Sequence, residues 1–110
     1  MNALLPLVAE RLPEVHALCE KYGVKSLSIF GSAAKGSFNA EKSDLDFVVE
    51  FLPDTPAGGL HGPYFSLLCE LQELFGRNVD LVDRNHIENP YFVEVLKLTQ
   101  RPVYESPAAA

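Results

Sequence analysis

The chain has few cysteines, few basic residues and no long apolar run. Its 110 residues include two cysteines, and 15 acidic residues against 9 lysines and arginines give a formal net charge of −6. This acidic balance argues against a domain that relies on long-range attraction to RNA or DNA, so no direct nucleic-acid binding is expected.

Neither Cys19 nor Cys69 lies at a metal-binding interval from another cysteine or a histidine, which predicts two buried free thiols.

The N-terminal segment and the length of the chain suggest a small cytoplasmic protein. Residues 1–8 are apolar but short, and Glu10 and Arg11 follow them, so neither a signal peptide nor a membrane span is expected. A chain of this length forms one domain with a single core, which we assign to residues 1–105. Residues 106–110 are rich in alanine and are predicted to be a disordered tail.

Aspartates interrupt two apolar segments that otherwise have the composition of β-strands. Successive side chains of a strand point to opposite faces, so Asp44 and Asp46 should share one face, with Cα atoms about 7 Å apart. A third aspartate, Asp80, lies within the apolar segment 78–82. The opposite face of the Asp44/Asp46 strand is expected to be core and contains Leu45, Phe47, Val49 and Phe51. One such pair alone is compatible with an ordinary solvated face, but aspartates on two strands favour a chemical role.

A glycine-serine turn precedes the first aspartate pair. Gly31 and Ser32 follow the apolar run 27–30 directly, and eleven residues separate Ser32 from Asp44. Glycine lets a phosphate approach the backbone, and consecutive N–H groups in such a turn form a concave anion site. The segment is not a P-loop, because Ser37 rather than lysine follows Gly36. The turn and the carboxylates together have the parts of a metal-dependent nucleotidyl transfer site, since Mg²⁺ prefers carboxylate and phosphate oxygens.

These segments resemble the minimal nucleotidyltransferases of the polymerase-beta superfamily. The resemblance rests on residues 31–36, 43–49 and 79–82 and extends from about Tyr22 to Tyr104. It implies that ATP is the substrate and that two Mg²⁺ ions are bound. The residues implied to bind the nucleotide are Gly31, Ser32, Lys35 and Ser43, and those implied to be catalytic and to bind the metals are Asp44, Asp46 and Asp80. Asp80 is also implied to accept the proton of the attacking hydroxyl.

The periodicity predicts an α/β domain with a polymerase-beta-type nucleotidyltransferase core, a small mixed sheet flanked by helices. The expected strands are residues 24–30, 45–51 and 78–82, with an edge strand at 103–104 and a hairpin-like link between the first two. The expected helices are a short piece within 3–11, one from Pro13 to about Gly23, one from Tyr64 to Gly76, and one that Asn89 caps and Pro90 begins. The segment 53–63, which includes His61, is predicted to be a surface loop that connects rather than gates. His16 and His86 are expected to be surface residues without a catalytic role.

Two functions of different classes remain open. The resemblance implies an enzyme that moves AMP from ATP to a hydroxyl, expected to be that of a tyrosine, on a protein partner. Stand-alone proteins of this size resemble the antitoxins of two-gene systems, whose partner is a toxin of the HEPN class. The alternative is a non-catalytic binding module that neutralises such a partner by occlusion. Three carboxylates that repel one another favour the enzyme, because a relic site has no reason to retain them.

Overall fold

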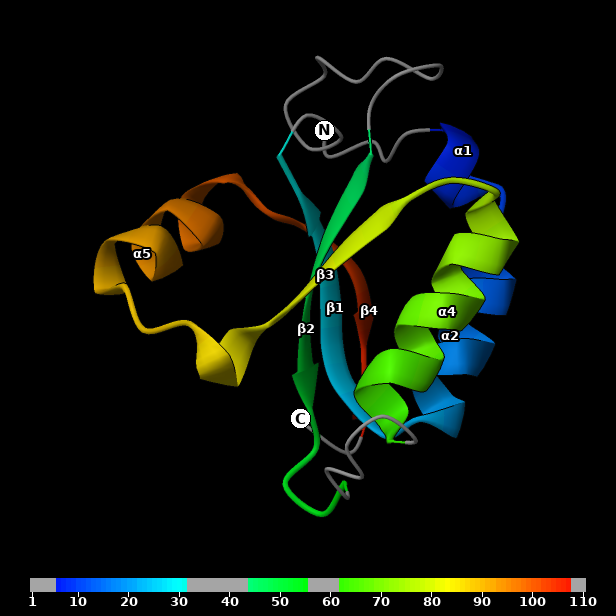
Figure 1. The fold of residues 1–110 in the computed structure, drawn as a ribbon, viewed down its shortest axis with the longest axis horizontal. Helices are drawn as coiled ribbons and strands as arrows, with labels where there is room; N and C mark the ends of the chain where they lie inside the picture. The colour runs from blue at the N-terminus through cyan, green and yellow to red at the C-terminus, as the bar shows by residue number, and fades with distance from the viewer. Residues whose placement is uncertain (1–5, 32–43, 56–61, 108–110) are drawn as a thin grey trace.

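The computed structural model describes residues 6–31, 44–55 and 62–107, and its helices and strands are shown in Figure 1. In chain order the elements are α1 (Pro6–Ala9), α2 (Leu12–Lys21), β1 (Val24–Phe30), β2 (Leu45–Phe51), α4 (Pro63–Phe75), β3 (Val79–Asp83), the 3₁₀ turn η2 (Arg84–His86), α5 (Pro90–Thr99) and β4 (Arg101–Glu105). None of the helices in these ranges has the length and apolar character needed to cross a membrane.

The strands form one mixed sheet in the order β3-β2-β1-β4. β1 runs antiparallel to both β2 and β4, whereas β2 and β3 run parallel because α4 carries the chain back between them. This arrangement confirms the predicted α/β fold with a mixed sheet. The predicted edge strand is β4, which is longer than the two residues expected because it pairs with β1 from Ser26 to Ile29.

Helices cover both faces of the sheet. α2 and α4 lie against one face, with α5 on the other side (Figure 1). The core under α2 and α4 includes Val15, Cys19, Leu27, Ile29, Leu45, Phe47, Val49, Leu67, Leu71 and Phe75, all buried. Phe47 stacks on Phe75 with ring centroids 6.0 Å apart. Burying one such side chain stabilises the fold by about 1.5–3 kcal/mol, so this face holds the domain together.

The alternation predicted for β2 is observed. Leu45, Phe47 and Val49 are fully buried in the core, and Phe51 is half-buried and packs against it. Asp46 lies between them on the opposite face and is only half-buried. The strand therefore has a core face, and an opposite face that is half-buried at Asp46 and Glu50 but buried at Val48.

Helix ends follow local signals that are visible in the sequence. Pro13 lies in the first turn of α2, and Gly76 ends α4 in the left-handed conformation with φ of 61°. Asn89 caps α5, because its side-chain oxygen accepts a hydrogen bond from the Tyr91 backbone N–H at 2.9 Å. Each of these helix ends depends on only a few neighbouring residues, so it can be predicted from the sequence before the fold is known.

Three expectations from the sequence are corrected. β3 begins at Val79 and includes Asp83, one residue later at each end than predicted. Cys69 is exposed on α4, whereas Cys19 is buried as expected, and burial raises the pKa of the Cys19 thiol to about 12. Ser106 is not part of a tail, because it is buried and its backbone N–H donates to the Lys25 carbonyl at 2.8 Å.

We expect Asn89→Ala to lower the free energy of unfolding by about 1 kcal/mol, because the Tyr91 N–H loses its capping partner. Urea unfolding followed by circular dichroism measures this change. Asn85→Ala is the matched control, since Asn85 engages Asp83 through its backbone N–H and not through its side chain. Equal effects of the two substitutions would contradict a capping role for Asn89.

Candidate active site

The parallel pairing of β2 and β3 brings two of the three predicted carboxylates together. Asp46 is in direct register with Asp80, so the two side chains leave the same face of neighbouring strands. Asp44 lies immediately before β2 and is exposed. It belongs to the same cluster, because its charge contributes to the raised pKa of Asp46. The structure therefore brings Asp44, Asp46 and Asp80 to one end of the sheet.

The cluster is electrostatically unfavourable when all its members are ionised. The pKa of Asp46 is raised from 3.8 to about 6, first by burial, then by a hydrogen bond and the charge of Asp80, and then by the charge of Asp44. A hydrogen bond between two carboxyl groups requires a proton on one of them. Asp46 and Asp80 thus share a site that favours either a proton or a cation.

Gly31 adjoins this cluster at the end of β1. Its φ of +68° lies in the left-handed region, which side chains rarely adopt. A Cβ atom at this position would lie 2.5 Å from Oδ2 of Asp46, closer than non-bonded atoms approach. Glycine is therefore required both by the backbone conformation of the turn and by the carboxylate packed against it.

The remaining predicted site residues cannot be located in the same way. Ser32, Lys35 and Ser43 fall outside the described residues, so their roles in nucleotide binding stay predictions. His61 and most of the 53–63 loop also fall outside them, and the connecting role of this loop is not tested. Within the described part of the chain, the candidate site residues are Gly31 and the three aspartates.

The donor set suits a hard divalent cation, although it is not arranged around one point. Among residues 6–31, 44–55 and 62–107, no three histidine, cysteine, aspartate or glutamate side chains form a group that could hold a metal ion as they stand. Carboxylate oxygens are nevertheless the ligands that Mg²⁺ prefers. Asp46 and Asp80 already meet, and the exposed Asp44 side chain is free of the core and can turn toward them.

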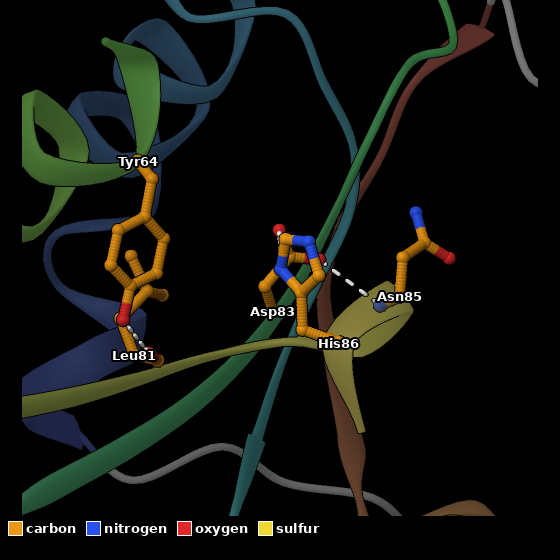
Figure 2. A network of polar contacts seen from close by, with 5 residues as sticks. All are labelled: Tyr64, Leu81, Asp83, Asn85 and His86. Atoms are coloured by element: carbon orange, nitrogen blue, oxygen red, sulfur yellow. Dashed lines mark hydrogen bonds and ion pairs between the residues drawn. The ribbon is translucent and has the colours of Figure 1, made fainter. Parts of the chain in front are cut away.

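A second polar cluster lies at the other end of β3 and has a structural role (Figure 2). The Asp83 carboxylate accepts a hydrogen bond from the Asn85 backbone N–H at 3.0 Å and lies 3.2 Å from the His86 ring. The Tyr64 hydroxyl donates to the carbonyl oxygen of Leu81. Burial first, and the nearby Asp83 and Asp80 charges next, raise the pKa of Tyr64. Asp83 thus caps η2, a turn that the sequence analysis did not identify.

Two clefts in the described surface lie away from Asp46 and Asp80. One, of about 660 Å³, is lined by Phe51, Tyr64, Phe65, Asp83 and His86 among others. Another, of about 650 Å³, lies between the end of α2 and the turn after β2 and includes Lys21 and Asp54. Both are at the end of β2 remote from Asp46, so we do not assign the chemistry to them.

The two histidines in the described residues lie on the surface of the protein. The His16 ring nitrogen Nε2 lies 2.9 Å from the carbonyl oxygen of Val103, and its ring packs edge-on against Tyr104. The His86 side chain is 83% exposed and pairs with Asp83. Neither lies in the aspartate cluster.

Comparison with known proteins identifies the family. Residues 15–99 match the model of the nucleotidyltransferase domain, which covers more than half of the chain. A protein of Methanocaldococcus jannaschii named "Putative protein adenylyltransferase" is 47% identical over 74 residues, 67% of this chain and 70% of that protein. A second protein of the same name from this organism is 40% identical over 74 residues, 67% of this chain and 71% of the relative. The chain therefore belongs to the nucleotidyltransferase domain family and is a nucleotidyltransferase.

Solved structures share the fold. A structure described as a "putative minimal nucleotidyltransferase" superposes with a TM-score of 0.73 at 28% identity, covering 89% of this chain and 96% of the other. A toxin-antitoxin crystal structure with AMP-PNP gives a TM-score of 0.66 at 16% identity, covering 88% and 75%. A tri-AMPylated HEPN toxin of Shewanella oneidensis in complex with MNT antitoxin gives 0.63 at 14% identity, covering 92% and 75%. The two complexes support the fold, and the first structure agrees with the family.

We expect Asp46→Asn to stabilise the metal-free protein, and to do so more at pH 8 than at pH 4. The raised pKa of Asp46 means that the folded protein keeps this proton when the unfolded chain has lost it, so stability falls as pH rises from about 4 to about 6. Solvent screening limits the effect at this half-exposed group to about 1 kcal/mol. Urea unfolding in EDTA at several pH values measures it. The control is Asp54→Asn, an exposed residue remote from the cluster, and a pH-independent difference for Asp46→Asn would contradict the shared-proton description.

Gly31→Ala should destabilise the protein by about 2–3 kcal/mol, of which about 1–2 comes from the positive φ and the rest from displacing the Asp46 carboxylate. In an Asp46→Ala background the second part should vanish, since the Asp46 Cβ is an ordinary 3.6 Å from the added atom. Gly76→Ala is the control, with a similar φ of +61° and nothing within 4 Å. A double-mutant cycle by chemical unfolding measures the coupling, and additive effects would show that the close approach is unimportant.

Proposed function

We propose that this nucleotidyltransferase is an Mg²⁺-dependent enzyme that transfers AMP from ATP to a tyrosine hydroxyl of a HEPN-type toxin, and thereby acts as the antitoxin of that toxin. The observation that supports it most directly is the pairing of Asp46 with Asp80 beside the Gly31 turn. Two facing carboxylates next to a backbone turn suit a cation and a phosphate chain together.

The chemistry requires little more than positioning and charge. The acceptor oxygen forms a bond to the α-phosphorus, the bond from that phosphorus to the pyrophosphate oxygen breaks, and pyrophosphate leaves with the electron pair. Two Mg²⁺ ions held by Asp44, Asp46 and Asp80 would supply charge stabilisation for the entering and leaving oxygens. Asp80 is exposed at the rim of the cluster, and we assign to it the proton of the attacking hydroxyl. Gly31 leaves the backbone open to the phosphates.

The similar proteins support the acceptor and the partner. The relatives from M. jannaschii are named as protein adenylyltransferases, which favours a protein acceptor. A structural neighbour contains a HEPN toxin that is AMPylated and bound to an MNT antitoxin, and another contains AMP-PNP. We place the protein in the cytoplasm, where thiols such as Cys19 and Cys69 stay reduced.

We expect the purified protein, with ATP and Mg²⁺, to add AMP to a co-encoded HEPN-type partner at substoichiometric amounts, because one enzyme molecule turns over many partners. Asp46→Asn and Asp44→Asn should each slow transfer by about 100-fold or more, since each removes a carboxylate of the cluster. Mass spectrometry of the partner over time measures the transfer and locates the modified residue. Asp54→Asn, which leaves the cluster intact, should retain full activity.

Occlusion predicts a different set of results in the same experiment. A binding module would inhibit the partner without ATP, would need at least an equal amount of protein, and would tolerate loss of all three carboxylates. Partner activity titrated against the triple Asp44→Asn, Asp46→Asn, Asp80→Asn variant separates the two. Stoichiometric, ATP-independent inhibition by this variant would reject the catalytic proposal and favour the binding module.

A further inference from the structure

An aromatic pair borders the carboxylate cluster on the same face of the sheet. Phe30, the last residue of β1, is in direct register with Asp46 of β2, so both side chains leave the same face with Cα atoms about 5 Å apart. The Phe92 ring of α5 meets the Phe30 ring edge to face, with centroids 6.1 Å apart and planes at 76°. We call these two residues the Phe30–Phe92 pair.

The pair differs from the aromatic pair that belongs to the core. Phe47 and Phe75, on the opposite face, are 0% and 6% exposed and stack with planes at 30°. Phe30 and Phe92 are each half-buried, and Phe30 is the member of the pair that lies beside Asp46. The accessible part of these apolar rings can be covered by a ligand, which would add to the free energy of binding.

α5 is also attached to the sheet by a residue other than Phe92. Leu96, one turn beyond Phe92, is 1% exposed and is the fully buried side chain of this helix. The capped N-terminus at Asn89 fixes where the helix begins. These two features hold α5 on the sheet, which leaves the accessible surface of the Phe30–Phe92 pair available to a ligand.

We propose that the Phe30–Phe92 pair is the platform on which the base of the bound nucleotide stacks. This inference rests on the proposed function, which places the phosphates at the Gly31 turn and the aspartates. Only the ribose separates the α-phosphate from the base, so a base attached to phosphates at Asp46 can reach the neighbouring residue Phe30. Every base has an aromatic face, so the platform selects a base-bearing nucleotide over a bare polyphosphate without selecting one base over another.

The test compares two ligands on the same variant. Phe92→Leu keeps an apolar side chain and removes the ring. We expect the affinity for a non-hydrolysable ATP analogue with Mg²⁺ to fall about 10-fold, since base–aromatic stacking contributes about this much or more. The affinity for inorganic tripolyphosphate with Mg²⁺, which has no base, should stay unchanged. Isothermal titration calorimetry measures both.

Two further variants make the comparison decisive. Tyr91→Leu is the matched control, because Tyr91 is the neighbouring aromatic residue of α5 and is 76% exposed away from the core. It should change neither affinity. Phe30→Leu removes the ring that β1 contributes to the platform and should give the same result as Phe92→Leu. Having both variants keeps the test valid if one of them fails to fold. Thermal unfolding of each variant confirms that it is folded.

The outcomes separate this inference from the proposed function. If Phe92→Leu weakens both ligands equally, or weakens neither, the pair serves only to attach α5 and the inference is wrong. If the wild-type protein binds tripolyphosphate as tightly as the ATP analogue, the base makes no contact and the inference is also wrong. If the ligand difference is found while the partner is not modified, the platform stands and the proposed transfer to that partner fails.

Discussion

The register of the parallel pair β2–β3 is the constraint on which the site depends. It places Asp46 beside Asp80, and the same face holds Gly31 at the end of β1. Shifting that register by one residue would turn the aspartates of one strand toward the buried core. The apolar residues of β2 resist such a shift, because Leu45, Phe47 and Val49 would then lose their burial. Hydrophobic packing on one face thus determines the electrostatics of the other.

One face of the sheet stabilises the fold, and the other face carries the candidate site. α2 and α4 bury the apolar side of the sheet, and their packing supplies most of the favourable free energy of folding. The opposite face carries carboxylates whose repulsion opposes folding until a proton or a cation is present, as the raised pKa of Asp46 indicates. A domain of this size can hold such a cluster because the well-packed face compensates for it.

Several features could be predicted from the sequence because they depend on near neighbours. The alternation in residues 45–51 follows from the two-residue period of a strand, and the ends of α4 and α5 follow from Gly76 and Asn89. The exposure of Cys69 could also have been predicted, because Cys69 lies off the helical face of α4 that carries Leu67, Leu71 and Phe75. The burial of Ser106 depends on a hydrogen bond to Lys25, a residue far away in the chain.

The sequence by itself determined which residues are candidates for the chemistry: a glycine at a turn, and aspartates placed singly within apolar strands. It singled out Asp80 through the family resemblance, but it could not show that Asp80 faces Asp46. The tertiary structure decided this, because β2 and β3 are joined only through α4 and their register is set by side chains packing under that helix. Asp80 therefore faces Asp46, whereas Asp83, three residues later, leaves the other face and caps a turn.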